Sequence, residues 1–257
     1  MHWQIIAFDT LDSTNLEAKR MLQDLTAEQS LHGVVITAEQ QTGGKGRLGR
    51  AWVSPAGTGL WFTAMLQPKL PMEQASLLSF TAAISVAEAI QQTTGLSVKL
   101  KWPNDVLLDG RKLCGILLEL IPYSKTDYYI AVGIGINVNQ KKEDFPPELQ
   151  EQATSIAMVS GQTIDRAILL EAIIQQLQKN CALLESQGFA PIRDQWKAWS
   201  AIIGQEVSVQ QYGKELYTGI AEDIAMNGCL LVRTANVLQS VSAADVSIRS
   251  KNRDYIF

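Results

Sequence analysis

Cysteine is scarce in this chain of 257 residues. Cys114, Cys181 and Cys229 are widely spaced, form no C-x-x-C pair and have no histidine close to them in the sequence. Disulfide frameworks and zinc sites need paired or clustered ligands, so neither is supported. We interpret the three thiols as small core residues.

Long apolar runs are also missing. No segment approaches eighteen uninterrupted apolar residues, and the first residues lack the basic start and apolar run of a secretory signal. We therefore expect a cytoplasmic protein that does not associate with membranes.

An excess of positive charge is the third absence. The formal net charge is -4, whereas broad binding to nucleic acid needs a clustered excess of lysine and arginine. Any basic patch must therefore be local. Hydrophobic residues make up 46% of the chain, which is enough to bury one large core and a smaller one.

Helical and strand patterns alternate irregularly and without an internal repeat, so we predict an α+β fold. Thr14 and Glu17 have the spacing of a capping box at the start of a helix. Asp109-Gly110 between two apolar runs predicts a hairpin. Further strands are expected at 34–38, 60–66 and 129–139, and further helices at 73–92, 165–187 and 192–201.

After Gly204 the pattern changes to short strands separated by turns. We expect a catalytic or binding domain over 1–203 and a small β-barrel over 204–257. The sequence is equally compatible with a packed extension and with a docking module for a partner.

The segment 41–52 reads QTGGKGRLGRAW, in which glycines alternate with Lys45, Arg47 and Arg50. Backbone amides and cations can converge there on one phosphate or carboxylate. The spacing matches neither a P-loop nor a dinucleotide fingerprint, so a solvated surface loop is an equally good interpretation of this segment alone.

The strand predicted at 129–139 carries large apolar residues on one face and Ala131, Gly133, Gly135 and Asn137 on the other. Glycine weakens a strand, so two on one face indicate that something approaches the backbone closely. We favour a ligand over packing as the approaching group.

Six motifs follow one another along the chain in a fixed order. They are Ser13-Thr14-Asn15, the segment 41–52, Lys101-Trp102-Pro103-Asn104-Asp105, Arg111-Lys112-Leu113, Gly115-Ile116-Leu117 and Gly135-Ile136-Asn137. Taken together, these motifs resemble those of the biotin protein ligases, in the short form without an N-terminal DNA-binding domain. The resemblance covers nearly the whole chain, up to Arg249.

The resemblance implies a mixed-sheet catalytic domain of the biotin/lipoate ligase type and chemistry in two steps. Biotin and ATP give biotinyl-5'-AMP and pyrophosphate, and biotin then passes to a lysine of a biotin carboxyl carrier protein or domain. Bringing a carboxylate to a triphosphate meets like-charge repulsion of about 4 kcal/mol per close pair. Cationic side chains and a Mg²⁺ ion would offset that repulsion. The Mg²⁺ ion would be held mainly by the ATP phosphates and not by a dedicated protein cage.

The resemblance also implies which residues act. As catalytic residues it indicates Lys112, which would stabilise the reacting phosphate, and Arg47, which would close over the intermediate. We add Asp105 as a base for the acceptor lysine. The residues expected to bind biotin are Ser13, Thr14, Asn15, Gln41, Lys45, Gly46, Arg47, Lys112, Gly115, Gly133 and Gly135. Those expected to bind ATP or the adenylate are Arg47, Arg50, Trp52, Lys101, Asn104, Lys112 and Asn137. Lys45 departs from the commonest family pattern, which has arginine at that position.

Three other functions compete with this interpretation. A lipoate ligase would use the same fold class on a different acid. A biotin-responsive repressor would need a DNA-binding region, and the twelve residues before Ser13 are too few for a helix-turn-helix, so no binding to DNA is expected. A module that binds without turnover is the third. A homodimer formed by pairing sheet edges is compatible with the sequence.

Overall fold

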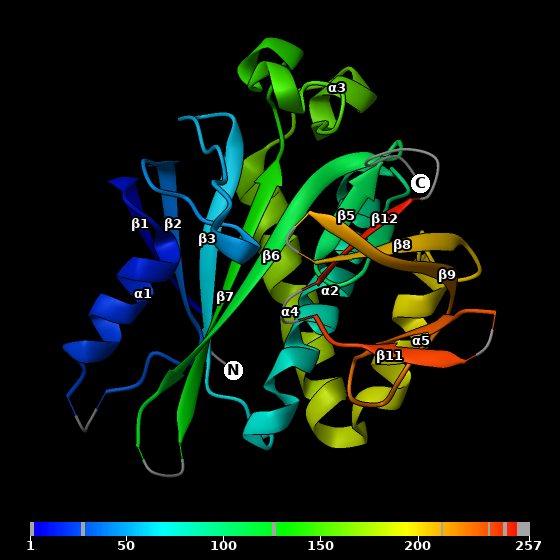
Figure 1. Ribbon diagram of the computed structural model, residues 1–257. Coiled ribbons are helices and arrows are strands. Elements are labelled where there is room, and N and C mark those ends of the chain that lie inside the picture. The colour runs from blue at the N-terminus through cyan, green and yellow to red at the C-terminus, as the bar shows by residue number, and fades with distance from the viewer. Residues whose placement is uncertain are drawn as a thin grey trace.

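The computed structural model describes residues 3–26, 29–124, 127–211, 213–235, 237–243 and 246–250. Residues 251–257 of the predicted C-terminal domain lie outside these ranges. As predicted, helices and strands mix along the chain, and they form a large sheet with helices on both faces and a smaller sheet beside it (Figure 1).

The large sheet has seven strands in the order β1-β2-β3-β7-β6-β5-β4. β1 and β2 run parallel and the other neighbouring pairs are antiparallel, so the sheet is mixed. Its strands are β1 (Gln4–Leu11), β2 (Val34–Gln41), β3 (Gly59–Leu66), β4 (Lys99–Lys101), β5 (Asp105–Leu108), β6 (Arg111–Pro122) and β7 (Tyr128–Asn137).

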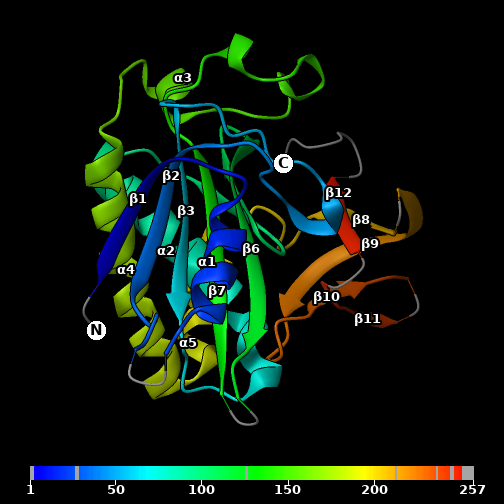
Figure 2. The same cartoon turned by 90° about the vertical axis from the view of Figure 1, so that its left-hand side faces the viewer.

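Helices cover both faces of this sheet (Figure 2). α1 (Thr14–Gln23) packs on one face through Ala18 and Leu22. α2 (Leu78–Thr94), α4 (Arg166–Gln187) and α5 (Phe189–Trp199) cover the opposite face and enclose the larger core. The predicted apolar face of β7 is confirmed, because Ile130, Val132, Ile134, Ile136 and Val138 are all buried in that core.

The remaining helical elements are short. They are η1 (Arg47–Gly49), η2 (Met72–Leu77), η3 (Lys142–Asp144), η4 (Pro147–Leu149) and α3 (Ile156–Ser160). Among the described residues, no helix combines the length and apolar character needed to cross a membrane.

The second sheet is antiparallel, with five strands in the order β11-β10-β9-β8-β12. They are β8 (Glu206–Gln211), β9 (Lys214–Ile224), β10 (Leu230–Arg233), β11 (Leu238–Val241) and β12 (Val246–Ser250). Apolar residues such as Val207 and Leu230 join the larger core, and the indole Nε1 of Trp102 donates to the carbonyl oxygen of Gly228 at 3.0 Å. The two sheets are therefore packed against each other.

Local predictions met mixed outcomes. The Asp109-Gly110 hairpin is present between β5 and β6, with φ of 52° and 70° at the two turn residues, as a type I′ turn requires. The helix predicted over 73–92 is wrong in its first part, because Pro71 and a 3-10 turn over Met72–Leu77 precede α2. Cys114 and Cys181 are buried, whereas Cys229 is only partly buried.

The predicted capping box at α1 is also wrong. Ser13 is the residue before the helix, but its side chain makes no capping hydrogen bond to the helix amides. Glu17 instead pairs with Arg20, at 2.7 Å, and the hydroxyl of Thr14 is used in a side-chain network inside the protein. Within the large sheet, β1 and β4 were not predicted from the sequence.

Candidate active site

A cavity of about 370 Å³ opens above the large sheet, between the start of α1, the glycine-rich loop and the second sheet. Every site residue predicted from the sequence lines it. These residues are Ser13, Thr14, Asn15, Gln41, Lys45, Gly46, Arg47, Arg50, Trp52, Lys101, Asn104, Asp105, Lys112, Gly115, Gly133, Gly135 and Asn137.

One end of the cavity is a buried network of uncharged polar groups. Gln41 Oε1 accepts from the backbone N–H of Thr14 at 2.9 Å and from its hydroxyl at 3.2 Å, and Gln41 Nε2 donates to Ser54 at 2.9 Å. Thr63 Oγ1 lies 2.8 Å from Thr14 Oγ1 and 2.5 Å from Asn15 Oδ1. Each group is fixed by its neighbours, so this end is a rigid arrangement of donors and acceptors.

The glycines of β6 and β7 make room for two side chains of the protein itself. A β-carbon at Gly135 would lie 2.5 Å from Trp52 Nε1, and one at Gly115 would lie 2.9 Å from the same ring. A β-carbon at Gly133 would lie 2.9 Å from Asn15 Cγ. Our preference for a ligand over packing therefore needs correction, because side chains that line the cavity occupy the space over these glycines.

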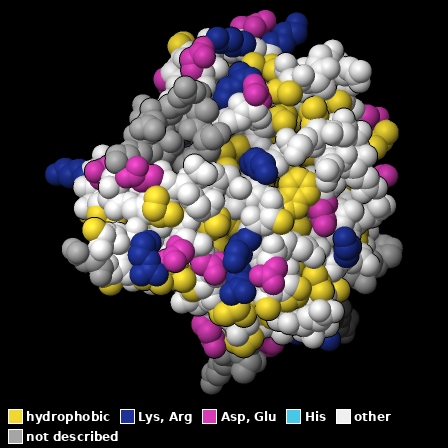
Figure 3. Space-filling view, turned by 90° about the vertical axis from the view of Figure 1, so that its right-hand side faces the viewer, with side chains coloured by type: hydrophobic (Ala, Val, Ile, Leu, Met, Phe, Trp, Pro, Cys, Tyr) yellow, Lys and Arg dark blue, Asp and Glu magenta, His cyan; other side chains and the backbone are white. Residues whose placement is uncertain are grey.

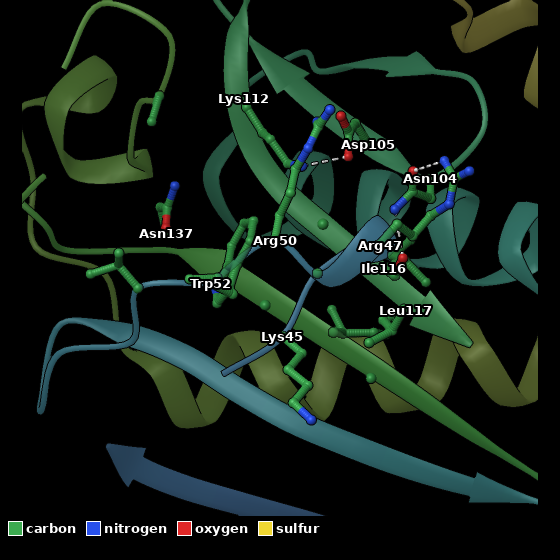
Figure 4. A pocket seen from close by; sticks show the side chains of 18 of the residues that line it. Lys45, Arg47, Arg50, Trp52, Asn104, Asp105, Lys112, Ile116, Leu117 and Asn137 are labelled. Atoms are coloured by element: carbon green, nitrogen blue, oxygen red, sulfur yellow. Dashed lines mark hydrogen bonds and ion pairs between the residues drawn. The ribbon is translucent and has the colours of Figure 1, made fainter. Parts of the chain in front are cut away.

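The glycine-rich segment 43–52, which we call the lid loop, folds back on itself. Gly46 N–H donates to Arg50 O at 2.7 Å, and Trp52 N–H donates to Gly44 O at 2.9 Å. Leu48 and Gly49 at its tip both have positive φ, 58° and 72°. The side chain of Lys45 extends away from the group formed by Lys112, Asp105 and Arg50 (Figure 4).

Arg47 connects the lid loop to both sheets. Its Nη1 donates to Asn104 Oδ1 at 3.2 Å, and its Nη2 donates to the carbonyl oxygens of Ala243 and, at 3.4 Å, Val246. Asn104 Nδ2 donates in turn to Ile116 O at 2.7 Å, which fixes the amide (Figure 4). Asn104 therefore orients the arginine, and the second sheet supplies backbone acceptors that hold it.

Lys112 and Asp105 form an ion pair at 2.7 Å, with side chains that are 25% and 13% exposed. The ammonium also lies 5.2 Å from the centroid of the Trp52 ring, within cation–π range. The backbone of Lys112 is braced on both sides, since its N–H donates to Gln152 O at 2.8 Å and its carbonyl accepts from Thr154 N–H at 3.0 Å. The charge of Lys112 is thus held in a fixed position.

Lys101 is the most deeply placed cation of the cavity, with 3% of its surface exposed. Burial lowers its pKa to about 7, and the nearby cations Arg249, Lys112 and Arg50 act in the same direction. The carboxylate of Asp105 opposes this shift.

Several residues of the wall were not predicted from the sequence. Phe145, Leu149 and Ala153 belong to the turns after β7, and Ile248 and Arg249 belong to β12. The first three lie in an irregular Pro- and Glu-containing stretch with no periodic pattern. Arg249 stands within the motif-bearing C-terminal segment, but its approach to the cavity depends on how the two sheets pack.

Comparisons with known proteins identify this arrangement. The model of the Biotin/lipoate A/B protein ligase family matches residues 7–137, and the model of the Biotin protein ligase C terminal domain matches residues 202–249. The chain belongs to the biotin/lipoate protein ligase family. It is therefore an enzyme of the ligase class.

Two relatives and one solved structure of this ligase family show how far the likeness extends. A biotin–acetyl-CoA-carboxylase ligase of Paracoccus denitrificans is 35% identical over 91% of this chain and 96% of its own length. A bifunctional ligase/repressor of Bacillus spizizenii is 33% identical over 96% of this chain and 75% of its own. The biotin protein ligase of Aquifex aeolicus, solved with biotin and ATP, superimposes with a TM-score of 0.82 at 30% identity, over 96% of this chain and 99% of that one.

Proposed function

We propose that this ligase activates biotin with ATP to biotinyl-5'-AMP and transfers the biotinyl group to one lysine of a biotin carboxyl carrier protein or domain. The observation that carries the proposal is the polarity of one continuous cavity. An uncharged hydrogen-bonding end and a strongly cationic end share it, and such a cavity suits a neutral ring bearing a carboxylate that must meet a polyphosphate.

Biotin binding is assigned to the uncharged end. A ureido ring offers two N–H donors and one carbonyl acceptor. Ser13, Thr14 and Asn15 present hydroxyl and amide groups in buried positions, and Gln41 adds a half-buried amide. These partners are already fixed, so little ordering entropy is lost when the ring enters. The carboxylate of biotin then points along β6 and β7 toward Lys112.

Adenylate formation is assigned to the cationic end. The biotin carboxylate attacks the α-phosphorus of ATP, the bond to the bridging oxygen breaks, and pyrophosphate leaves with the electron pair. Lys112 and Arg47 offset the negative charge that accumulates on the phosphate. Trp52 and Arg50 contact the adenylate, with Asn137 at the edge of the site. Mg²⁺ suits this donor set when phosphate oxygens supply most of its ligands, because Asp105, the one carboxylate of the described cavity wall, is engaged with Lys112.

In the second step the acceptor lysine must lose a proton, which costs about 4.6 kcal/mol at pH 7 for an unperturbed amine. Asp105 is our proposed base. Once the adenylate phosphate pairs with the ammonium of Lys112, the carboxylate of Asp105 is released to take a proton from the incoming ammonium of the acceptor lysine. The amine then attacks the acyl carbon, and AMP leaves.

The domain division at 203/204 is part of the proposal. It is supported by the two separate sheets and by the two family models, of which one matches residues 7–137 and the other begins at residue 202, close to the division. The cytoplasmic location and the homodimer stay predictions, as does the lack of binding to DNA.

The decisive experiment incubates the protein with biotin, ATP, Mg²⁺ and a candidate carrier domain, and measures the mass of the carrier. A gain equal to one biotinyl group, absent when ATP is omitted, is the expected result. Lipoate replaces biotin in a parallel reaction, and modification with lipoate alone would refute the choice of acid. Binding of biotin without release of pyrophosphate would refute turnover.

A further inference from the structure

Glu119 places a carboxylate beside the uncharged end of the cavity without lining it. It lies on β6, two positions after Leu117 on the same face of the strand, and the described wall of the cavity includes Leu117 but not Glu119. On α1, Asn15 and Lys19 lie one turn apart on one face of the helix. Both reach the carboxylate, since Asn15 Nδ2 donates to Oε2 at 2.8 Å and Lys19 Nζ donates to Oε1 at 2.5 Å. Glu119 therefore joins α1 to the sheet.

The contact with Asn15 distinguishes Glu119 from an ordinary acidic group of the surface. The outer face on the side of the second sheet shows Lys and Arg interspersed with Asp and Glu (Figure 3). Exposed ion pairs contribute little to stability because water screens them, and Lys19 and Glu119 are themselves 34% and 29% exposed. Asn15, by contrast, is only 5% exposed and lines the cavity. The second oxygen of Glu119 thus acts on a buried group of the site.

A carboxylate determines which edge of the Asn15 amide faces it. It accepts hydrogen bonds and has none to donate, whereas the amide has a donor edge and an acceptor edge. Nδ2 must therefore face Glu119, and Oδ1 faces Thr63. Leu117 O also accepts from Nδ2, but at 3.4 Å this bond is too long to fix the amide alone. The bare backbone of Gly133 gives the amide its place, since a β-carbon there would lie 3.0 Å from Nδ2.

The orientation of the Asn15 amide decides what Thr14 offers to the cavity. Thr63 Oγ1 carries one hydrogen and has two neighbouring oxygens, Asn15 Oδ1 at 2.5 Å and Thr14 Oγ1 at 2.8 Å. While Oδ1 faces Thr63, that hydrogen goes to Asn15, and a lone pair of Thr14 stays available. If the amide turned over, Nδ2 would donate to Thr63, and the hydrogen of Thr63 would move onto Thr14. That lone pair would then be closed to an N–H of a ureido ring.

We propose that Glu119 is a positioning residue for the biotin ring, because it holds the Asn15 amide in the orientation that lets the Thr14 hydroxyl accept from a ring N–H. This inference rests on the proposed function and deepens it. Glu119 touches no substrate and acts through the hydrogen bonds that join it to Asn15, Thr63 and Thr14. It should therefore affect the recognition of biotin and not that of ATP.

The test measures the Kd of biotin for Glu119→Gln. Glutamine has nearly the same shape as glutamate but presents either edge of an amide, so the orientation of Asn15 is no longer imposed. A loss comparable to one hydrogen bond predicts a rise of about 5- to 10-fold in the Kd of biotin. The KM for ATP in pyrophosphate exchange, measured at saturating biotin, should change by less than about twofold.

Lys19→Met is the matched control. It removes the same ion pair from the other side and leaves the carboxylate of Glu119 facing Asn15. Because the pair is partly exposed, the Kd of biotin for this variant should stay within about twofold of the wild type. Equal weakening of biotin by Lys19→Met and Glu119→Gln would assign the effect to the ion pair and overturn the inference.

Asn15→Ala supplies a second readout, because a merely structural role of Glu119 would survive the loss of the Asn15 amide. In that background Glu119→Gln should leave the Kd of biotin unchanged, so the double variant should bind biotin like Asn15→Ala alone. Effects of the two substitutions that multiply would overturn the inference, as would a wild-type Kd in Glu119→Gln or equal losses for biotin and ATP. If biotin-dependent exchange of pyrophosphate into ATP persists in the wild type under those outcomes, the proposed function stands without this inference. If the wild type lacks that exchange, the proposed function itself has failed.

Discussion

Alanine at Gly135 should damage the ATP end of the cavity and spare the biotin end. The added β-carbon would lie 2.5 Å from Trp52 Nε1 and 2.6 Å from Cε2 of the same ring. Ordinary contact requires about 3.5 Å or more, so the indole has to shift by roughly 1 Å. The ring is bulky and is held edge-on by Trp61, with centroids 6.3 Å apart, so it cannot yield by a simple rotation.

The expected size of the effect of Gly135→Ala follows from the free-energy cost of overpacking. Forcing one extra methyl group into a packed site costs about 1–3 kcal/mol, which corresponds to roughly 5- to 150-fold in an equilibrium constant. Because Lys112 lies over the ring of Trp52, we expect this cost to appear as a higher KM for ATP in pyrophosphate exchange. The Kd of biotin should change by less than about threefold, since the network around Gln41 reaches Trp52 only at its backbone carbonyl, through Ser54, and does not include the indole.

The matched control is Gly133→Ala, two residues away on the same face of β7. Its β-carbon would meet the amide of Asn15, which bonds to Thr63 and to Glu119. This variant should therefore raise the Kd of biotin and leave the KM for ATP nearly unchanged. Identical profiles for the two variants, or a larger effect of Gly135→Ala on biotin than on ATP, would refute the reasoning.

Three further predictions follow from the site. Asp105→Asn should slow transfer to the carrier at least tenfold more than it slows adenylate formation, as single-turnover measurement of each half-reaction would reveal. Equal slowing of both steps would remove Asp105 as the base. Arg47→Gly should release biotinyl-AMP and label bystander lysines, and Asn104→Ala should do so more weakly, because Asn104 orients Arg47 at 3.2 Å. Retained selectivity for the carrier in both variants would contradict this role. Trp102→Phe should lower the free energy of unfolding by roughly 1 kcal/mol, or about 3 °C in Tm, by removing the hydrogen bond to Gly228. A calorimetric scan that matches the wild type would mean that this bond does not stabilise the packing of the sheets.

Much of the fold was predictable because local chemistry and global packing agree. Asp109-Gly110 adopts the positive φ values that its residue types tolerate, and the apolar alternation of β7 faces the core. β1 escaped prediction because it is an edge strand whose exposed and half-buried positions follow no regular alternation. β4 was missed because three residues are too few to show a period.

The residue types of the site were visible in the sequence, but their partners were not. Glycines at 133 and 135 indicated a close approach to the backbone, whereas the identity of the approaching group depends on α1 and on the lid loop. Similarly, the spacing of Thr14 and Glu17 favoured a helix cap in isolation. In the folded protein the Thr14 side chain instead hydrogen-bonds to Gln41 and Thr63. These partners lie beside Thr14 only once β2 and β3 have paired, so the local sequence could not reveal them.

The order of charges in the cavity depends on strand register rather than on sequence proximity. Lys101 and Asp105 are four positions apart in the chain, yet the tight β4–β5 turn makes them cross-strand neighbours. A shift of one residue in that pairing would turn Lys101 to the opposite face, which packs against the helices. The buried Trp102, which follows β4 directly, anchors this register through Gly228 of the second sheet. The second sheet therefore shapes the cavity, because it fixes the register that aims Lys101 into the cavity and provides the carbonyl oxygens that hold Arg47.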